Sequence, residues 1–405
     1  MDNYAFFRCP KTIIYGSNSF QKVGIEAALR GKKALIVTDK IITGLGSIDV
    51  CISLLQKEGL QAAVYSGVNS EPTDAHVAEA LKIFQTENCD LIISIGGGSC
   101  IDTAKAVAVL ATNGGYIGDY MSGKKIADKT STPHIAIPTT GGTGSEASDV
   151  TVIINVLNDE KMMVKQPCFM PAVAIVDALL SVSSPKSVTA ATGVDALTHA
   201  IEAYISRKAH PLTDTLALSA MKLIIPHIRT AYYSGTNVKA REAMSLGSLQ
   251  AGMAFSNASV CLVHGMSRPI GALFHVPHGI SNAMLLPAVL SFTREECVKR
   301  IADLGRIFSG ETASYSDEEA SCFAIEEVKK LCMDLNIPNL KDYGIVQQSF
   351  GNALDKMASD ALKSGSPANN PKVPTHEEIK QLYVDCYDYS FVATASPANL
   401  INLHS

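Results

Sequence analysis

The chain has 405 residues, of which 47% are hydrophobic and 18% are charged, and its formal net charge is -5. This length exceeds one ordinary hydrophobic core, so two domains are expected. The mildly acidic balance, with no basic cluster, argues against a nucleic-acid partner and against binding to an anionic membrane. Ten cysteines without a CxxC pair, and an N-terminus without a signal-peptide pattern, predict a reducing, cytoplasmic location.

The first 180 residues alternate short apolar runs with helical patterns, which predicts a parallel sheet with helices on its faces. One helical pattern, DAHVAEALKIFQTE, follows Thr73, a residue suited to cap its N-terminus. The predicted strands are KALIVT (33–38), QAAVYSG (61–67), LIISIGGGS (91–99), HIAIPTT (134–140), VTVIIN (150–155) and VAIVD (173–177).

The remainder of the chain reads as helical, because residues 188–363 and 376–390 contain helical patterns and no convincing strand. Thr375 and Glu378 have capping-box spacing ahead of one such pattern. Ser, Pro and Lys at 183–187 predict a boundary. The expected architecture is an α/β domain over residues 1–184 followed by an all-helical domain over 185–405, with a ligand in the cleft between them.

A strand, a glycine turn and a helix follow one another in LIISIGGGSCIDTAKAVAVL. The three glycines at 96–98 let the backbone approach a ligand closely, and the free N–H groups of the following helix suit a pyrophosphate. The turn does not have the GxGxxG pattern, and a plain tight turn is the alternative.

A second loop, PTTGGTGSE (138–146), also follows an apolar strand and offers the hydroxyls of Thr139, Thr140, Thr143 and Ser145. Two such loops at strand ends favour nucleotide binding more than either alone. Asp39 closes another strand, where its carboxylate could bind a ribose diol and repel a 2'-phosphate. A helix cap or turn former is the alternative for Asp39.

A polar stripe runs along GVDALTHAIEAYIS (193–206), where Asp195, Thr198, His199 and Glu202 stand at i, i+3, i+4 and i+7. The simplest interpretation is a solvated helix face. The stripe contains no Lys or Arg, however, and the residues flanking it are unusually apolar.

A second cluster, VHGMSRPIGALFHVPHG (263–279), contains His264, His275 and His278. Asp195 and His199 lie one helical turn apart on the same face. Together with two of these histidines they would form a site of three nitrogens and one oxygen for a divalent transition metal.

The motifs GGGSCIDTAK, PTTGGTGSE, TGVDALTHAIEAY, AGMAFSNA and VHGMSRPIGALFHVPHGISNAMLLP occur in one order along residues 5–390. In this the chain resembles the iron-containing, or group III, alcohol dehydrogenases. The resemblance implies an N-terminal dinucleotide-binding domain and a C-terminal helical domain that holds Fe(II), or Zn(II) or another divalent ion. It also implies NAD(H)-dependent interconversion of a primary alcohol and its aldehyde. We expect a homodimer or larger homo-oligomer.

The resemblance assigns roles by position. The metal ligands would be Asp195, His199, His264 and His278. Gly97, Gly98 and Ser99 would hold the pyrophosphate, Thr139, Thr140 and Thr143 would line the nicotinamide half, and Lys161 would reach the nicotinamide ribose. Phe255 would form an apolar wall of the substrate pocket, and Asp39 matches the position of an acid that accompanies NAD preference.

Arg268 departs from the family pattern, since many relatives have a second histidine four residues after the ligand equivalent to His264. A guanidinium stays protonated and cannot relay a proton as that histidine is thought to do. The proton would then pass through solvent, His275 or the cofactor ribose.

We therefore expect Arg268 to bind an anionic group of the substrate, as in succinic semialdehyde or sulfoacetaldehyde. Alternatively, Arg268 pairs with Asp149 or Glu202 and never meets substrate. The alternative functions are a simple-alcohol or diol dehydrogenase of this family, a related zinc-dependent cyclase or glycerol dehydrogenase, and a nucleotide- or metal-binding module without turnover.

Overall fold

The computed structural model describes residues 4–158, 160–310 and 314–392. Its N-terminal part is built on a six-stranded sheet of order β1-β8-β5-β4-β2-β3, in which every neighbouring pair is parallel. The predicted parallel sheet is therefore confirmed. Its strands are β1 (Thr12–Tyr15), β2 (Lys33–Val37), β3 (Gln61–Tyr65), β4 (Leu91–Gly96), β5 (His134–Pro138) and β8 (Val173–Val176).

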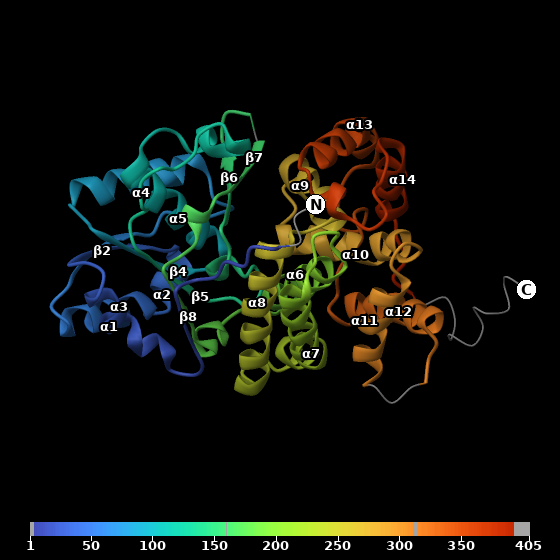
Figure 1. Ribbon diagram of the computed structural model, residues 1–405, viewed down its shortest axis with the longest axis horizontal. Coiled ribbons are helices and arrows are strands. Elements are labelled where there is room, and N and C mark those ends of the chain that lie inside the picture. Colours follow the sequence, from blue (N-terminus) through green and yellow to red (C-terminus); the bar gives the residue numbers. More distant parts are fainter. Residues whose placement is uncertain (1–3, 159, 311–313, 393–405) are drawn as a thin grey trace, which may run out of the picture.

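Helices cover both faces of this sheet (Figure 1). Ile36 and Ile93 point into the core beneath α1 and α3, whereas their neighbours Leu35 and Ile92 point into the core beneath α4 and α5. Strands buried on both faces need apolar residues at every position, which explains the continuous apolar runs in the sequence. The helices are α1 (Val23–Ala28), α2 (Lys40–Gly44), α3 (Ser47–Lys57), α4 (Asp74–Thr86) and α5 (Gly98–Asn113).

One predicted strand lies outside the parallel sheet. The run VTVIIN forms β6 (Val150–Asn155), which pairs antiparallel with β7 (Glu160–Lys165) in a separate two-stranded sheet. Strands β7 and β1 were not predicted from the sequence. A single isolated bridge joins Thr73, the N-cap of α4, to Ile154 of this hairpin.

The second part of the chain is helical, and no strand follows Val176 within the residues that the structure describes. The capping box of Thr375 and Glu378 is formed. The sheet ends at Val176 and α6 begins at Lys186, while the division at 184/185 stays a prediction. The helices are α6 (Lys186–Ile205), α7 (Pro211–Tyr233), α8 (Val238–Ala258), α9 (Leu262–Phe274), α10 (His278–Arg294), α11 (Val298–Ser309), α12 (Asp317–Asp334), α13 (Gln347–Lys363) and α14 (His376–Tyr387).

Short 3-10 helices connect several of these elements: η1 (Ser19–Lys22), η2 (Ile117–Gly123), η3 (Ser145–Ala147), η4 (Pro167–Phe169), η5 (Ala178–Ser181) and η6 (Pro367–Asn369). None of the described helices is by itself long and apolar enough to cross a membrane. By length and composition alone, α8 and α9 meet the criterion as a pair, bent by 101° where they join.

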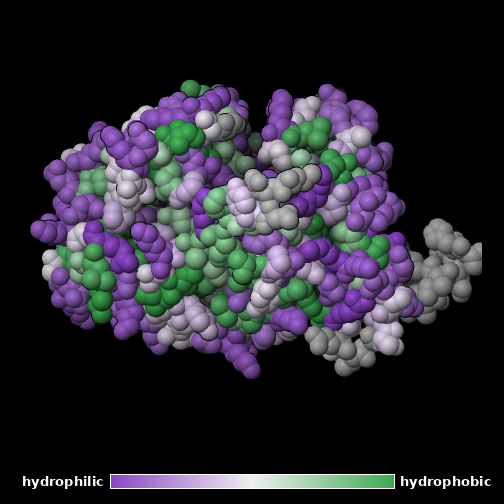
Figure 2. Space-filling model, viewed as in Figure 1, coloured by the Kyte–Doolittle hydropathy of each residue, from purple (hydrophilic) through white to green (hydrophobic). Residues whose placement is uncertain are grey.

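The second glycine loop joins the two parts of the molecule. Gly144 has φ 60°, and a Cβ there would lie 2.5 Å from the Cα of Gly252 on α8. A Cβ at Gly142 would lie 2.4 Å from Cβ of Thr192 on α6. Only glycine allows the loop to approach both helices this closely. Above this junction the surface is hollowed between the two halves (Figure 2).

Candidate active site

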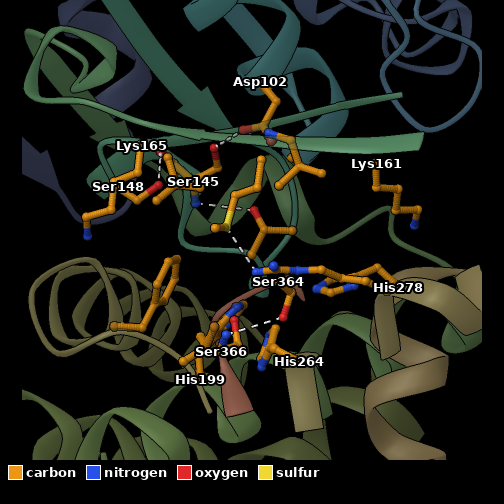
Figure 3. A pocket seen from close by; sticks show the side chains of 18 of the residues that line it. Asp102, Ser145, Ser148, Lys161, Lys165, His199, His264, His278, Ser364 and Ser366 are labelled. Carbon is orange, nitrogen blue, oxygen red and sulfur yellow. Dashed lines mark hydrogen bonds between the residues drawn. The ribbon is translucent and has the colours of Figure 1, made fainter. Parts of the chain in front are cut away.

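Four predicted metal ligands converge from three helices. Asp195 and His199 lie one turn apart on α6, His264 lies in the first turn of α9, and His278 is the first residue of α10. One ligating atom from each lies within 4.8 Å of all the others. Asp195, His199 and His264 are buried, and His278 borders the cavity above them (Figure 3).

The chemistry of these donors fits a divalent transition metal. Nδ1 of His199 is buried and has no hydrogen-bond partner. Burial lowers the pKa of His199 to about 4 and that of His278 to about 3, so both imidazoles are neutral at pH 7 with a lone pair available. Three imidazole nitrogens and one carboxylate oxygen form a donor set that such ions prefer.

Glu202 orients His264 within this centre. Its Oε2 accepts a hydrogen bond of 2.6 Å from Nδ1 of His264, and its two oxygens also accept the backbone N–H groups of Cys261 and Val263. Nε2 of His264 is thereby turned toward Asp195, 3.6 Å away. Burial favours the neutral ring, but Glu202 and Asp195 outweigh it and raise the pKa of His264 to about 9.

Asn282 also belongs to this centre and was not predicted from the sequence. Its Nδ2 donates to Oδ1 of Asp195 at 2.7 Å and lies 3.1 Å and 3.2 Å from the Nε2 atoms of His264 and His278. The available signal was its position one turn after His278 in the motif HGISN. Asn282 thus restrains the carboxylate of Asp195.

The two glycine loops lie side by side at the carboxyl ends of β4 and β5. Gly97 is the N-cap of α5, and a Cβ placed there would lie 3.9 Å from Thr140 Oγ1. A Cβ at Gly98 would lie 2.8 Å from Thr143 Cγ2. Thr139 donates its backbone N–H to the carbonyl of Gly96 at 3.0 Å. The predicted pyrophosphate turn, which ends at Ser99, and the threonine loop therefore form one surface at the N-terminus of α5.

Asp39 is the N-cap of α2 and lies beside the first glycine turn. Its Oδ1 caps α2 by accepting the N–H of Ile42 at 2.8 Å. Its Oδ2 accepts the thiol of Cys100 at 3.7 Å and would lie 3.6 Å from a Cβ on Gly96. The cap is thus formed, and the carboxylate stands beside the glycine turn. Its role in cofactor choice stays a prediction.

A cavity of ≈ 430 Å³ opens between the two halves (Figure 3). Phe255 stacks on the His199 ring with centroids 4.3 Å apart and forms part of the wall. Lys161 also borders the cavity and pairs with Glu71 at 2.6 Å. The predicted site residues among those that line it are Gly98, Ser99, Thr143, Lys161, Asp195, His199, Phe255, His264, Arg268 and His278.

Arg268 faces this cavity, and Glu202, the described carboxylate that attracts its charge, lies beyond ion-pair distance. Its Nη2 lies 3.0 Å from Sδ of Met163, and no carboxylate among the described residues lies within ion-pair distance. Asp149 instead contacts Ser256 and Lys165, and Glu202 contacts the α9 region. Burial lowers the pKa of Arg268 to about 10, so the group remains a cation at neutral pH.

His275 occupies a different position. It ends α9 with φ 54° and borders a neighbouring cavity of ≈ 510 Å³, which shares Glu71 and Ile154 with the first. The structure therefore brings His264 and His278 together and leaves His275 apart from them.

Asp102, Lys105 and Ser148, on the sheet side of the cavity, were not identified from sequence, whereas Ser145 was predicted as a hydroxyl donor of the second glycine loop. Asp102, Ser145 and Ser148 line it, and Lys105 lies directly behind them with hydrogen bonds to both serines. The available signal was Asp102 and Lys105 at i, i+3 in an otherwise apolar helix.

The structure combines a parallel sheet of the kind that binds nucleotides with a buried cluster of three histidines and one aspartate. This combination is typical of a metal-dependent dehydrogenase. Residues 10–178 match the iron-containing alcohol dehydrogenase family, and residues 189–387 match the C-terminal region of the same family. 1,3-Propanediol dehydrogenase of Citrobacter freundii is 37% identical over 378 residues, which cover 92% of this chain and 96% of that protein.

Solved structures give the same result. That of a 1,3-propanediol oxidoreductase has a TM-score of 0.91 and 36% identity, covering 95% of this chain and 100% of that one. Sulfoacetaldehyde reductase from Bifidobacterium kashiwanohense, in complex with NAD+, has a TM-score of 0.84 and 26% identity, covering 96% and 100%. The chain belongs to the iron-containing alcohol dehydrogenase family and is an alcohol or aldehyde oxidoreductase.

Proposed function

We propose that this protein is a metal-dependent NAD(H) oxidoreductase that interconverts a primary alcohol and its aldehyde, and that it favours aldehydes carrying a carboxylate or sulfonate. The observation that carries the substrate preference is Arg268, a cation that faces the cavity of the four metal ligands without a described carboxylate partner. A guanidinium matches carboxylate and sulfonate groups through paired hydrogen bonds. The similarity to a sulfoacetaldehyde reductase supports this class of substrate.

Asp195, His199, His264 and His278 would hold Fe(II), with Zn(II) or another divalent ion as the alternative. Such an ion supplies Lewis acidity that polarises a carbonyl or lowers the pKa of an alcohol. The pyrophosphate would bind at the N-terminus of α5, to Gly97, Gly98 and Ser99. The nicotinamide half would be lined by Thr139, Thr140, Thr143 and Lys161.

The chain's own side chains place the reactants. Phe255, stacked on His199, supplies an apolar surface that excludes water from the reacting carbon. Oδ2 of Asp39 stands at the glycine turn, where it would accept a ribose hydroxyl and disfavour a 2'-phosphate. Arg268 keeps its proton at neutral pH, so the proton of the product alcohol comes from solvent or from the cofactor ribose.

The test follows NADH oxidation by protein reconstituted separately with Fe(II) and Zn(II), using propanal, succinic semialdehyde and sulfoacetaldehyde. We expect higher kcat/KM for the two anions and loss of activity with a chelator. In Arg268→Gln and Arg268→His, kcat/KM should fall about 10-fold to 100-fold for the anions, as for a lost charged hydrogen bond, and change little for propanal. Lys208→Gln, which removes an exposed cation of the same cavity, is the matched control.

The outcomes separate the alternatives. An unchanged preference in Arg268→His would give Arg268 a structural role. Preference of the wild type for propanal would favour a simple-alcohol or diol dehydrogenase, and absence of turnover with either metal would favour a non-catalytic binding module. The cytoplasmic location and the homo-oligomeric assembly stay predictions.

A further inference from the structure

Arg268 belongs to the same wall of the cavity as a metal ligand. It lies on α9 one turn after His264, so both side chains are on the helix face that lines the cavity. A guanidinium has five N–H donors and stays charged at neutral pH. Among the described residues, the one acceptor within hydrogen-bond distance of it is Sδ of Met163, 3.0 Å from Nη2. A thioether is a weak and uncharged acceptor, so this cation is poorly compensated.

Met163 lies on the hairpin face that forms the opposite wall. Side chains alternate along β7, so that Met162 and Val164 are buried in the core of the sheet half, whereas Lys161, Met163 and Lys165 line the cavity. Met163 is the central residue of the three. It therefore meets the guanidinium because of its register in β7.

The two lysines on either side of Met163 are already paired. Lys161 pairs with Glu71 at 2.6 Å, and Lys165 pairs with Asp149 at 3.3 Å. Both lysines stand on the sheet side of the cavity (Figure 3). Of these three cations, the guanidinium is the one that an incoming anion can bind without breaking an ion pair.

We propose that Met163 is a specificity-determining residue, whose thioether covers the guanidinium of Arg268 and gives way to the carboxylate or sulfonate of the substrate. Methionine is unbranched and has three rotatable bonds, so its sulfur can move aside easily. An anionic oxygen in its place would accept a stronger, charge-assisted hydrogen bond. The anionic end of the substrate would then lie between α9 and β7. The inference rests on the proposed preference for anionic aldehydes.

A carboxylate at position 163 would occupy the guanidinium permanently, which gives the first test. In Met163→Glu we expect kcat/KM for succinic semialdehyde and sulfoacetaldehyde to fall about 10-fold to 100-fold, as for a lost charged hydrogen bond, and kcat/KM for propanal to change little. Met163→Gln has the same shape without the charge and should lose less. Met163→Leu has no acceptor, and it should use the anions at least as well as the wild type.

A binding measurement separates this subsite from turnover. Isethionate is the alcohol that corresponds to sulfoacetaldehyde, and it cannot be oxidised by NADH, so calorimetry of metal-loaded protein with excess NADH gives its Kd. This Kd should rise in Met163→Glu and should not rise in Met163→Leu. The matched control is Val150→Glu, which adds a carboxylate to the same hairpin face but opposite Lys165. It should change the Kd much less.

Equal losses in Met163→Glu and Val150→Glu would overturn the role of Met163, because general repulsion of anions would explain both. An unchanged Kd in a folded Met163→Glu would overturn it too, as would an equal loss in Met163→Leu. If Met163→Glu does not fold, weaker binding of isethionate by Met163→Gln than by Met163→Leu supports the role, and equal binding contradicts it. Failure of the wild type to bind isethionate would instead overturn the proposed substrate preference, which the wild-type titration reports separately.

Discussion

Glu202 and His264 share a hydrogen bond of 2.6 Å between Oε2 and Nδ1, buried beneath the metal centre. The same carboxylate accepts two backbone N–H groups at the start of α9. One side chain therefore fixes both the entry of the helix and the ring orientation of its ligand. The hydrogen bond keeps a proton on Nδ1, so Nε2 is the nitrogen at which a bound cation would replace a proton.

Replacing Glu202 with Gln should weaken metal binding. The amide carries no charge and cannot stabilise the His264 ring as the carboxylate does, so we expect metal affinity to fall roughly 10-fold to 100-fold. Competition with a metal indicator measures this affinity directly. Glu87→Gln removes an exposed carboxylate paired with Lys33 and should leave it unchanged. Equal affinities in Glu202→Gln and wild type would contradict the role of Glu202.

Metal removal should lower thermal stability. A cation that binds only the folded chain adds stability that grows with its free concentration, so the Tm should rise as Fe(II) or Zn(II) is titrated into chelated protein. His199→Ala removes one ligand and should flatten this response. His227→Ala, which removes a histidine bonded to the carbonyl of Leu223, should retain it. A flat response in the wild type would mean that the four residues hold no metal.

Gly97 and Gly98 should respond differently to alanine. A Cβ at Gly98 would collide with Thr143 at 2.8 Å, so Gly98→Ala should lower both the Tm and the affinity for NADH. A Cβ at Gly97 would meet only ordinary contacts, at 3.9 Å or more, from Thr140. Gly97→Ala should therefore keep the wild-type Tm and weaken NADH binding alone, because its methyl group would occupy the space of the pyrophosphate. Calorimetry and NADH titration of both variants check this, and full NADH affinity in Gly97→Ala would place the pyrophosphate elsewhere.

Glu146 should make stability depend on pH. Burial raises its pKa from 4.5 to about 7, so the unfolded chain loses this proton at lower pH than the folded protein does. Its contribution to stability is present below pH 4.5 and is lost as the pH rises through 7. Glu146→Gln removes the effect, so the variant should gain roughly 3 kcal/mol on the wild type between pH 4.5 and pH 8. Denaturant unfolding at both pH values measures the gain, and a constant difference would refute the assignment.

Structural elements could be predicted from the sequence where a local pattern of apolar residues reflects burial. All six apolar runs contain strands, and five of them lie in the parallel sheet, where a central strand such as β4 needs an apolar side chain at every position. The four ligands could be predicted because Asp195 and His199 share a turn and the other two lie in a recognisable motif. Their mutual distances came only from the packing of α6, α9 and α10.

Local sequence patterns could not predict which strands pair with each other or which polar residues form buried hydrogen-bond networks. The run VTVIIN has the composition of a sheet strand, yet its partner is β7, whose EKMMVK sequence carries a charge at each end. Lys105 and Asp102 resemble a surface pair on a helix, and their burial depends on serines 40 and 43 residues away. Asn282 has no sequence pattern of its own beyond its spacing from His278.

The contact of Gly144 with Gly252 limits how the enzyme can move. At this contact the backbone of the loop packs directly against the backbone of α8. No deformable side chain separates the sheet half from the helical half there, so one half cannot easily rotate against the other. Gly142 likewise packs against Thr192 on α6, the helix that carries Asp195 and His199. We therefore expect the two halves to move as one body at this loop, with cofactor exchange depending on the walls of the cleft and not on a hinge between domains.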